Sequence, residues 1–405
     1  MSRRSAALAF IFVTVVLDML ALGLVIPVLP HLIEAFTGGD TAAAAGYNGL
    51  FATVWALMQF VAMPIMGGLS DRFGRRPVIL LSNLGLGLDY VLMALAPNLA
   101  WLFVGRVISG VTAASISTAM AYVADVTAAE KRAGSYGLVG MAFGVGFVFG
   151  PAIGGLLGTV GPRLPFWAAA GCSLANALYG LIVLPESLPA ERRRAFEWRR
   201  ANPVGSVRLL RSHRQLVRLA SAAFLSNLAH AVLPATFVLY AAYRYNWNAG
   251  DVGLALAAVG ASSAIVQGGL VGPMVRRFGE RRVLLAGLLA GAMSFLIYGC
   301  AQSGRAFLAG VPFGALWGLA GPAGQGLMSR LVGPDQQGAL QGANGSLLGV
   351  ASMIGPVMFA SVFSWFIGGG AAWHLPGAAY LLASLLLLLA AVLAARVTAT
   401  ARNPA

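Results

Sequence analysis

The chain has 405 residues, of which 59% are hydrophobic and only 10% are charged. A soluble protein of this length would carry about 25% charged residues, so the composition excludes an ordinary water-soluble domain. The formal net charge of +14 would suit a nucleic-acid partner, but the positions of the basic residues, described below, argue against one.

Twelve apolar stretches follow one another along the chain, and most are near or above the ~20 residues that cross a bilayer as an α-helix. The stretches are roughly 6–33, 46–69, 77–97, 99–122, 133–158, 164–185, 216–243, 250–273, 282–301, 304–330, 336–363 and 373–396. A membrane β-barrel would show short alternating segments instead. The sequence therefore predicts an all-α membrane protein with 12 transmembrane helices.

The basic residues lie mostly on one side of these predicted spans. Of the 27 Lys and Arg residues, only Arg163, Arg244 and Arg305 fall in loops on the other side, and Arg106 lies within a span. Such a bias follows the positive-inside rule and predicts that both termini are cytoplasmic. The positive charge thus indicates topology, and we expect no nucleic-acid partner.

A Gly-rich, charged segment recurs at the same place in two halves of the chain, as GGLSDRFGRR at 67–76 and GPMVRRFGERR from 272. Internal duplication is typical of secondary transporters, which bind substrate where the repeats meet. The longest hydrophilic stretch, about 186–215, divides the spans six and six. We therefore predict an N-terminal six-helix bundle at 1–185, a cytoplasmic linker at 186–215 and a C-terminal six-helix bundle at 216–405. We expect the basic linker to lie against anionic lipid headgroups, with a regulatory docking site as the alternative.

Enzymatic activity is not expected from this sequence. The other loops are too short for a catalytic or nucleotide-binding domain, and no Walker sequence occurs. Cys172 and Cys300 lack metal-ligand spacing, and packing is the expected role of both. We predict no metal and no cofactor, a proton gradient as the energy source, and a monomer whose partners are protons and a small-molecule substrate.

Two acidic residues lie well inside predicted spans, Asp18 in the first and Asp89 in the third. An intramembrane carboxylate costs roughly 2.5–3.5 kcal/mol on insertion scales and indicates a functional site. Asp18 has no basic residue near its depth on its own helix, which favours it as a protonation site. The alternative is a neutral carboxyl group that bonds to a helix break near Gly23 and Pro27. Asp89 and Arg106 are predicted at similar depth on adjacent helices, where an ion pair and a proton relay both remain open.

Sparse polar and aromatic residues within the spans are candidates for contacts with an amphiphilic substrate. Taken one by one, residues of this kind more often pack helices together than contact a ligand. These candidates are Asn48, Trp55, Gln59, Phe143, Phe147, Asn227, His230, Ser263, Gln267, Trp317 and Asn344.

Several motifs together resemble the major facilitator superfamily. GGLSDRFGRRP at 67–77 is similar to its signature between helices 2 and 3, LFVGRVISGVTAA at 102–114 to its helix-4 motif, and GFVFGPAIGG at 146–155 to its helix-5 antiporter motif. LDMLALGLVIPVLPHL at 17–32 and QQGALQG at 336–342 are similar to the tetracycline/proton antiporter branch. The resemblance covers essentially the whole chain and implies two pseudo-symmetric six-helix bundles, alternating access and proton-coupled drug efflux in the inner membrane.

The resemblance also implies roles for individual residues. Arg106 takes the position of an arginine implicated in proton coupling, beside the candidates Asp18 and Asp89. The turn between helices 2 and 3 implies a conformational latch formed by Gly67, Asp71, Arg72, Gly74, Arg75 and Arg76, with Lys131 and Arg132 as possible partners of Asp71. The helix-5 motif implies a hinge that limits proton leak, formed by Gly146, Gly150, Pro151, Gly154 and Gly155; packing alone is the alternative.

The sequence departs from this branch at two positions. Ala290 stands where the branch has a functionally important aspartate in helix 9, and Ser263 stands near the position of a helix-8 histidine. We therefore expect export of drug-like or amphiphilic molecules, with tetracycline as one possible substrate. The alternative is a proton-linked transporter of a sugar or organic acid, which the same fold permits.

Overall fold

The computed structural model describes residues 3–113, 115–127, 132–193, 214–333, 336–368 and 373–397. Within these ranges the chain is helical and contains no strand. Lys131 and most of the predicted linker lie outside the described residues. The described chain divides into two compact units, Met1–Asn202 with Asn246–Gly260, and Pro203–Tyr245 with Ala261–Ala405.

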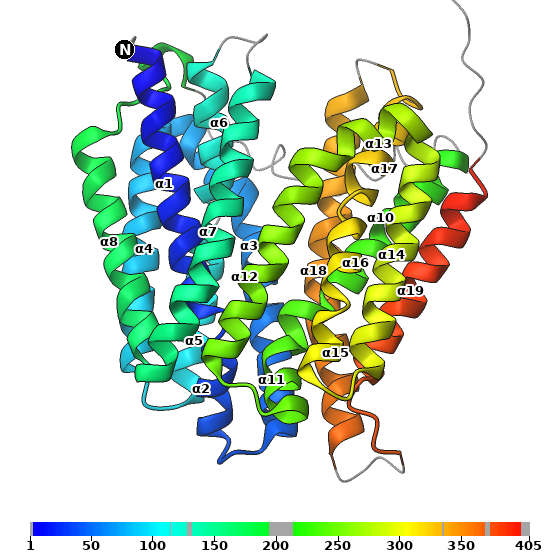
Figure 1. Cartoon of the computed structure of the whole chain (residues 1–405). Helices are drawn as coiled ribbons and strands as arrows, with labels where there is room; N and C mark the ends of the chain where they lie inside the picture. Colours follow the sequence, from blue (N-terminus) through cyan, green and yellow to red (C-terminus); the bar gives the residue numbers. More distant parts are fainter. Residues whose placement is uncertain are drawn as a thin grey trace, which may run out of the picture. The chain divides into compact units, whose positions relative to one another are not determined.

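The first unit is a bundle of long helices (Figure 1). Its helices are α1 (Arg3–Val25), α2 (Leu29–Phe36), α3 (Thr41–Phe73), α4 (Arg75–Leu95), α5 (Leu99–Thr112), α6 (Ser115–Val126), α7 (Arg132–Val160), α8 (Leu164–Val183) and the first part of α12 (Ala249–Ile265). α1 packs on α7 and α8, and α4 packs on α5 and α8. Ile11, Val15, Tyr122, Val123 and Ala142 form part of the apolar core between α1, α6 and α7. The unit therefore places α1, which carries Asp18, between two neighbouring helices.

The second unit contains shorter helical segments as well as long helices. They are α10 (Arg214–His230), α11 (Val232–Tyr245), the π-helical turn η4 (Val266–Leu270), α13 (Val271–Phe278), α14 (Glu280–Cys300), α15 (Gly304–Leu308), α16 (Val311–Trp317), α17 (Ala320–Ser329), α18 (Gln337–Ile367) and α19 (Ala378–Ala395). The rings of Tyr298 and Phe307 stack with centroids 4.0 Å apart, and Tyr240 Oη donates to the carbonyl oxygen of Tyr298 over 2.8 Å. These aromatic side chains connect α11, α14 and α15 at one end of the unit.

Within the described residues, 11 helical segments are long and apolar enough to cross a membrane. Each overlaps one of the predicted apolar stretches. The remaining stretch, 99–122, corresponds to α5 and α6, which are 14 and 12 residues long. Large apolar side chains such as Leu178, Leu181 and Ile182 on α8 are more than half exposed, as expected of surface that faces lipid.

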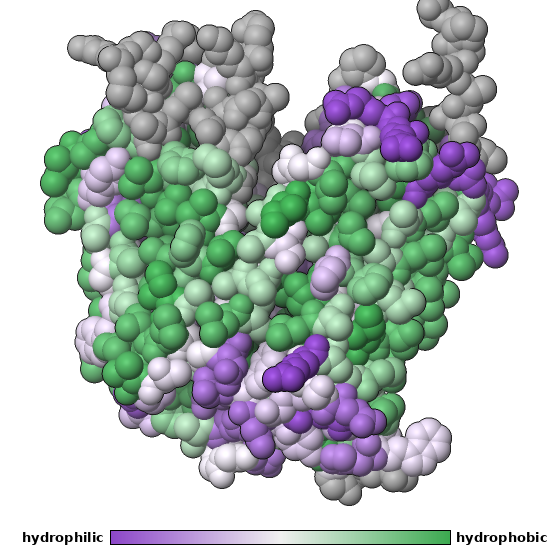
Figure 2. All heavy atoms as spheres, viewed as in Figure 1, coloured by the Kyte–Doolittle hydropathy of each residue, from purple (hydrophilic) through white to green (hydrophobic). Residues whose placement is uncertain are grey.

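Polar residues gather at helix ends, and side chains cap the first turns of α3 and α5. On the second unit, purple residues gather toward the ends of the helices, and green residues cover much of the surface between them (Figure 2). Asp40 accepts hydrogen bonds from the amides of Ala42 and Ala43 at the start of α3. Asn98 accepts one from the amide of Trp101 at the start of α5. These caps satisfy amides that have no partner within their own helix.

Candidate functional site

Asp18 is buried on α1, with 8% of its surface exposed. Asn176 on α8 donates from Nδ2 to Asp18 Oδ1 over 2.8 Å and to the carbonyl oxygen of Thr14 over 2.9 Å. No ion pair to Asp18 is found in the described part of the chain. The carboxyl group therefore has a neutral hydrogen-bond partner from another helix. Asn176 was not among the candidate residues predicted from the sequence.

Asp89 and Arg106 form a second charged site in the first unit. Asp89 is 1% exposed, and its Oδ1 lies 3.0 Å from the position that a Cβ atom on Gly105 would occupy. The two charged residues therefore lie at the same level of adjacent helices, as predicted. Of the two roles left open for these residues, the ion pair is not formed among the described residues. Neither carboxylate oxygen of Asp89 nor Arg106 Nε has a hydrogen-bond partner there. The Arg106 guanidinium instead lies 5.4 Å from the centroid of the Trp55 ring. Arg106 therefore lies on the face of α5 that is directed toward α3, where the Trp55 ring attracts the cation.

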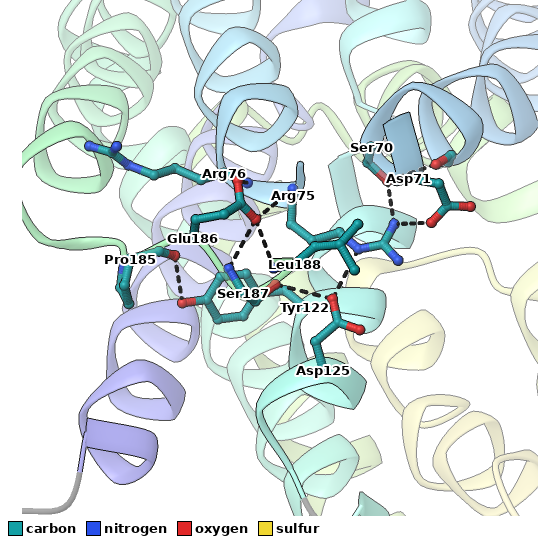
Figure 3. A network of polar contacts seen from close by, with 11 residues as sticks. Ser70, Asp71, Arg75, Arg76, Tyr122, Asp125, Pro185, Glu186, Ser187 and Leu188 are labelled. Atoms are coloured by element: carbon teal, nitrogen blue, oxygen red, sulfur yellow. Dashed lines mark hydrogen bonds and ion pairs between the residues drawn. The ribbon is translucent and has the colours of Figure 1, made fainter. Parts of the chain in front are cut away.

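Arg75 is the centre of an ionic network at one end of the first unit (Figure 3). Its Nη1 lies 2.6 Å from Asp71 Oδ1 and donates to Ser70 Oγ over 2.6 Å. Its Nε donates to Asp125 Oδ2 over 3.1 Å. The side chain of Arg75 is 11% exposed, so these contacts balance a mostly buried cation. Among the described residues, the partner of Asp71 is thus Arg75. Lys131 and the side chain of Arg132, which were expected as partners of Asp71, lie outside what the structure describes. Asp125, the last acidic residue of α6, was not among the sequence candidates.

Glu186 binds the start of α4 in the same network. Its Oε1 accepts from the amide of Arg75 over 2.9 Å, and its Oε2 accepts from the amide of Arg76 over 3.3 Å. The same carboxylate accepts from the amides of Ser187 and Leu188 (Figure 3). A negative charge is favourable at a helix N-terminus, where free amides and the helix dipole concentrate positive charge. Glu186 was also missed, and the only signal for it was a lone acidic residue directly after the sixth apolar stretch.

The turn between α3 and α4 requires glycine at position 74. Gly74 has φ of +105°, a conformation that other residues rarely adopt. A Cβ atom at this position would also contact the Glu186 carboxylate. Of the other predicted latch residues, Arg72 lies 5.1 Å from the centroid of the Phe73 ring, and Gly67 has open space around its Cα atom. The network therefore centres on Arg75 and involves only part of the predicted set.

The second unit contains a copy of this network in which the charges are reversed. Asp71, Arg75 and Asp125 correspond to Arg276, Glu280 and Arg330, each 205 positions later. Arg330 Nη2 donates to Glu280 Oε1 over 2.8 Å, which repeats the contact between α4 and α6 with opposite polarity. The turn is also repeated, because Gly279 has φ of +78° at the position that corresponds to Gly74. No ion pair joins Arg276 to Glu280 within the described ranges, so the second network is smaller than the first.

The predicted hinge glycines bring three helices into close contact. A Cβ atom on Gly150 would lie 2.7 Å from Gly23 Cα on α1. Gly146 and Gly154 face α1 in the same way, whereas Gly155 faces Gly253 on α12, 3.0 Å from its added Cβ atom. α7 continues as a helix through Pro151. Gly146, Gly150 and Gly154, spaced four residues apart, therefore share the face of α7 that packs closely on α1, and Gly155 contacts a different neighbour.

The substrate candidates of the first unit lie on two helices. Asn48, Trp55 and Gln59 belong to α3, and Phe143 and Phe147 belong to α7. Asn48 is buried and Phe147 is exposed. The helices carry these residues at different depths, and Trp55 contacts the charged site through Arg106.

Several candidates of the second unit converge. Asn227 and Asn344 line a cavity of about 190 Å³ between α10, α14, α17 and α18. The rings of His230 and Trp317 lie 5.5 Å apart. Gln267 lies against Gly318, with its Cγ 3.3 Å from an added Cβ atom. Ser263 belongs to α12, before the π-helical turn.

Two further polar residues line the same cavity. Ser226 and Gln325, which were not among the predicted substrate residues, also line the cavity. Trp317 Nε1 donates to Ser226 Oγ over 3.1 Å. No group of three or more His, Cys, Asp or Glu residues able to hold a metal occurs among the residues that the structure describes.

Comparisons with known proteins agree on one family. Residues 11–356 and 219–404 match the Major Facilitator Superfamily. The chain is 39% identical over 377 residues to the class C tetracycline resistance protein of Escherichia coli, covering 93% of this chain and 94% of that protein. It is 38% identical over 371 residues to the class G tetracycline resistance protein of Vibrio anguillarum, covering 92% and 93%. The crystal structure of the human organic anion transporter MFSD10 (TETRAN) has the same fold, with a TM-score of 0.70 at 24% identity over 97% of this chain and 100% of that one.

Proposed function

This chain belongs to the Major Facilitator Superfamily, and from that premise we propose that it is a proton-coupled exporter of drug-like small molecules. The observation that carries the proposal is the 39% identity to a tetracycline resistance protein over nearly the full length of both chains. The chain is a multi-pass membrane transporter and not an enzyme. Tetracycline is the first compound to test, although Ala290 and Ser263 replace two residues expected in that branch.

Proton coupling is supported by the environment of Asp18. The carboxyl group is buried and receives a hydrogen bond from a neutral amide, Asn176. A buried carboxyl group without a cationic partner binds a proton more readily than one in water, and a nearby substrate or cation reverses that preference. We propose that Asp18 binds the transported proton and that Asp89 and Arg106 take part in its relay. The buried state of Asp89 supports this, since neither of its carboxylate oxygens has a hydrogen-bond partner among the described residues. A buried charge without a partner is unfavourable in a purely structural site.

Alternating access would use the networks at the ends of the two units. We propose that the Arg75 network is a latch on the cytoplasmic side. We also propose that the glycine contacts of α7 allow this helix to move against α1 and α12. This scheme has 12 transmembrane helices, two six-helix bundles joined by the linker 186–215, both termini in the cytoplasm and a location in the inner membrane. It requires no cofactor, and the chain would act as a monomer with its basic linker near anionic headgroups.

Inverted membrane vesicles provide the test. A pH gradient is imposed and followed with a pH-sensitive dye while tetracycline, lipophilic cations or sugars are added. We expect tetracycline to collapse the gradient through the wild-type protein but not through Asp18→Asn. Asp40→Asn is the matched control, because Asp40 lies at the exposed start of α3 and asparagine is as good a helix cap as aspartate. A response to sugars alone would contradict drug export, and full activity of Asp18→Asn would contradict the role of Asp18.

A further inference from the structure

The cavity of the second unit is large enough for part of a substrate. Its volume is about 190 Å³, and apolar protein cavities of about 150 Å³ bind a molecule of the size of benzene. Leu219, Leu284, Leu288 and Met328 supply apolar wall. The cavity therefore suits a single substituted ring.

Small residues create this space. Ala222 and Ala223 line the cavity from α10, and Gly321 and Gly324 line it from α17. A Cβ atom on Gly321 would meet nothing within 4 Å, whereas one on Gly324 would make an ordinary contact 3.6 Å from Leu284. The space beside Gly321 is consequently open, and a larger side chain at this position can occupy it without displacing the backbone.

The polar part of the wall is an amide pair. Asn344 Nδ2 donates to Gln325 Oε1 over 2.7 Å. Gln325 Nε2 and Asn344 Oδ1 are buried and have no hydrogen-bond partner among the described residues. Each amide carries an NH2 group that donates and a carbonyl oxygen that accepts, so the contact between them leaves the NH2 group of Gln325 and the oxygen of Asn344 unmatched. A buried donor or acceptor without a partner is unfavourable by about 1–3 kcal/mol.

A ligand group with matching polarity would satisfy both atoms. It needs an acceptor for Gln325 Nε2 and a donor for Asn344 Oδ1, which belong to two amides joined by one hydrogen bond. A primary carboxamide has this pattern on one planar edge. Asn227 and Ser226 extend the polar side of the wall, and the hydrogen bond from Trp317 to Ser226 holds the indole beside it.

We propose that this cavity is a substrate subsite that binds a ring through a primary carboxamide on its edge, recognised by Gln325 and Asn344. The proposal rests on the proposed drug-export function and specifies the chemical class of substrate that the second unit selects. The apolar wall takes the ring, and the amide pair distinguishes a carboxamide from groups that cannot both donate and accept. Such polar recognition discriminates more strongly than apolar contact, because a mismatched ligand leaves buried groups unpaired.

The test compares two probes on the purified full-length protein. Binding of tetracycline, which carries a ring carboxamide, is measured by isothermal titration calorimetry beside its analogue with a nitrile in place of the carboxamide. We expect the wild type to bind tetracycline about tenfold more tightly, which corresponds to roughly one to two lost hydrogen bonds. In Gln325→Leu the two affinities should become equal within about twofold. Gln302→Leu, an exposed change of the same kind in the same unit, should keep the wild-type ratio.

A second variant covers the case in which Gln325→Leu does not fold. Gly321→Leu should fill the cavity and weaken binding of both probes at least tenfold. Gly171→Leu is its matched control, because it also has open space around it and lies on the exposed surface of α8. Suppose that the wild type binds tetracycline. An unchanged ratio of the two affinities in Gln325→Leu, or unchanged binding by Gly321→Leu, would then overturn the subsite and leave drug export standing. Absence of tetracycline binding by the wild type would contradict the tetracycline specificity of the proposed function and this subsite with it.

Discussion

Replacement of Arg75 by methionine tests how much the ionic network stabilises the first unit. Methionine keeps an unbranched apolar stem and removes the guanidinium. The change eliminates the contacts to Asp71 at 2.6 Å, Ser70 at 2.6 Å and Asp125 at 3.1 Å. The corresponding residue in the reversed copy is Glu280, whose partner Arg330 makes one ion pair. Arg330→Met is therefore a control of the same chemical kind.

The exposures of the side chains set the expected magnitudes. Asp71 is 49% exposed, so water replaces most of its interaction and the loss there is about 0–1 kcal/mol. Ser70 is buried and the Asp125 side chain is 23% exposed, and hydrogen bonds to charged groups in such places contribute about 1.5–3 kcal/mol. We expect Arg75→Met to lower the free energy of unfolding by about 3 kcal/mol. Arg330 is 65% exposed, and its loss should have an effect of about 0–1 kcal/mol.

The assay is unfolding of the purified proteins in mixed micelles with rising SDS, followed by tryptophan fluorescence. The two variants are measured beside the wild type at low ionic strength and again at high salt. High salt should reduce the small effect of Arg330→Met and leave most of the effect of Arg75→Met, because buried pairs are screened less. An effect of Arg330→Met as large as that of Arg75→Met would refute the reasoning, since exposure would then not determine the contribution of each network.

Two further predictions concern helix contacts in the first unit. Asn176→Leu removes the hydrogen bond to Asp18 and should lower the free energy of unfolding by about 1–3 kcal/mol. Unfolding in mixed micelles measures this change. A free energy of unfolding equal to that of the wild type would show that water replaces the bond. Gly154→Ala places a Cβ atom against the Leu24 carbonyl oxygen, so we expect reduced transport in vesicles and about 1–3 kcal/mol lower stability, whereas Gly171→Ala, which meets nothing within 4 Å, should behave like the wild type. Equal behaviour of the two alanine variants would contradict the close packing of α7 on α1.

The candidate site could be predicted only in part from the sequence. Asp18, Asp89 and Arg106 were identifiable because a charged residue within an apolar stretch is conspicuous without knowledge of its neighbours. Asn176 and Gln325 are uncharged, and nothing in their local sequence distinguishes them from residues that pack helices. Their partners lie 158 and 19 positions away along the chain, so only the folded chain connects them.

The reversed network illustrates the same limit. The repeat of the Gly-rich turn is visible in the sequence, and so is Arg276 in the place of an acidic residue, which makes the two copies of the turn asymmetric. The structure shows that Glu280 and Arg330 restore an ion pair with opposite polarity. Polarity could be exchanged because the attraction between two charges depends on their signs being opposite and not on which helix carries which sign.

The sequence by itself determined the class of protein, the positions of the membrane-spanning stretches and the buried charges, because apolar length and the cost of placing a charge in lipid are local properties of the chain. Only the tertiary structure decided that Arg106 faces Trp55 and not Asp89, that Asn176 binds Asp18, and that Glu186 binds the start of α4. These outcomes depend on which faces of neighbouring helices meet. A rotation of one residue, about 100° around a helix axis, is enough to turn a predicted partner away.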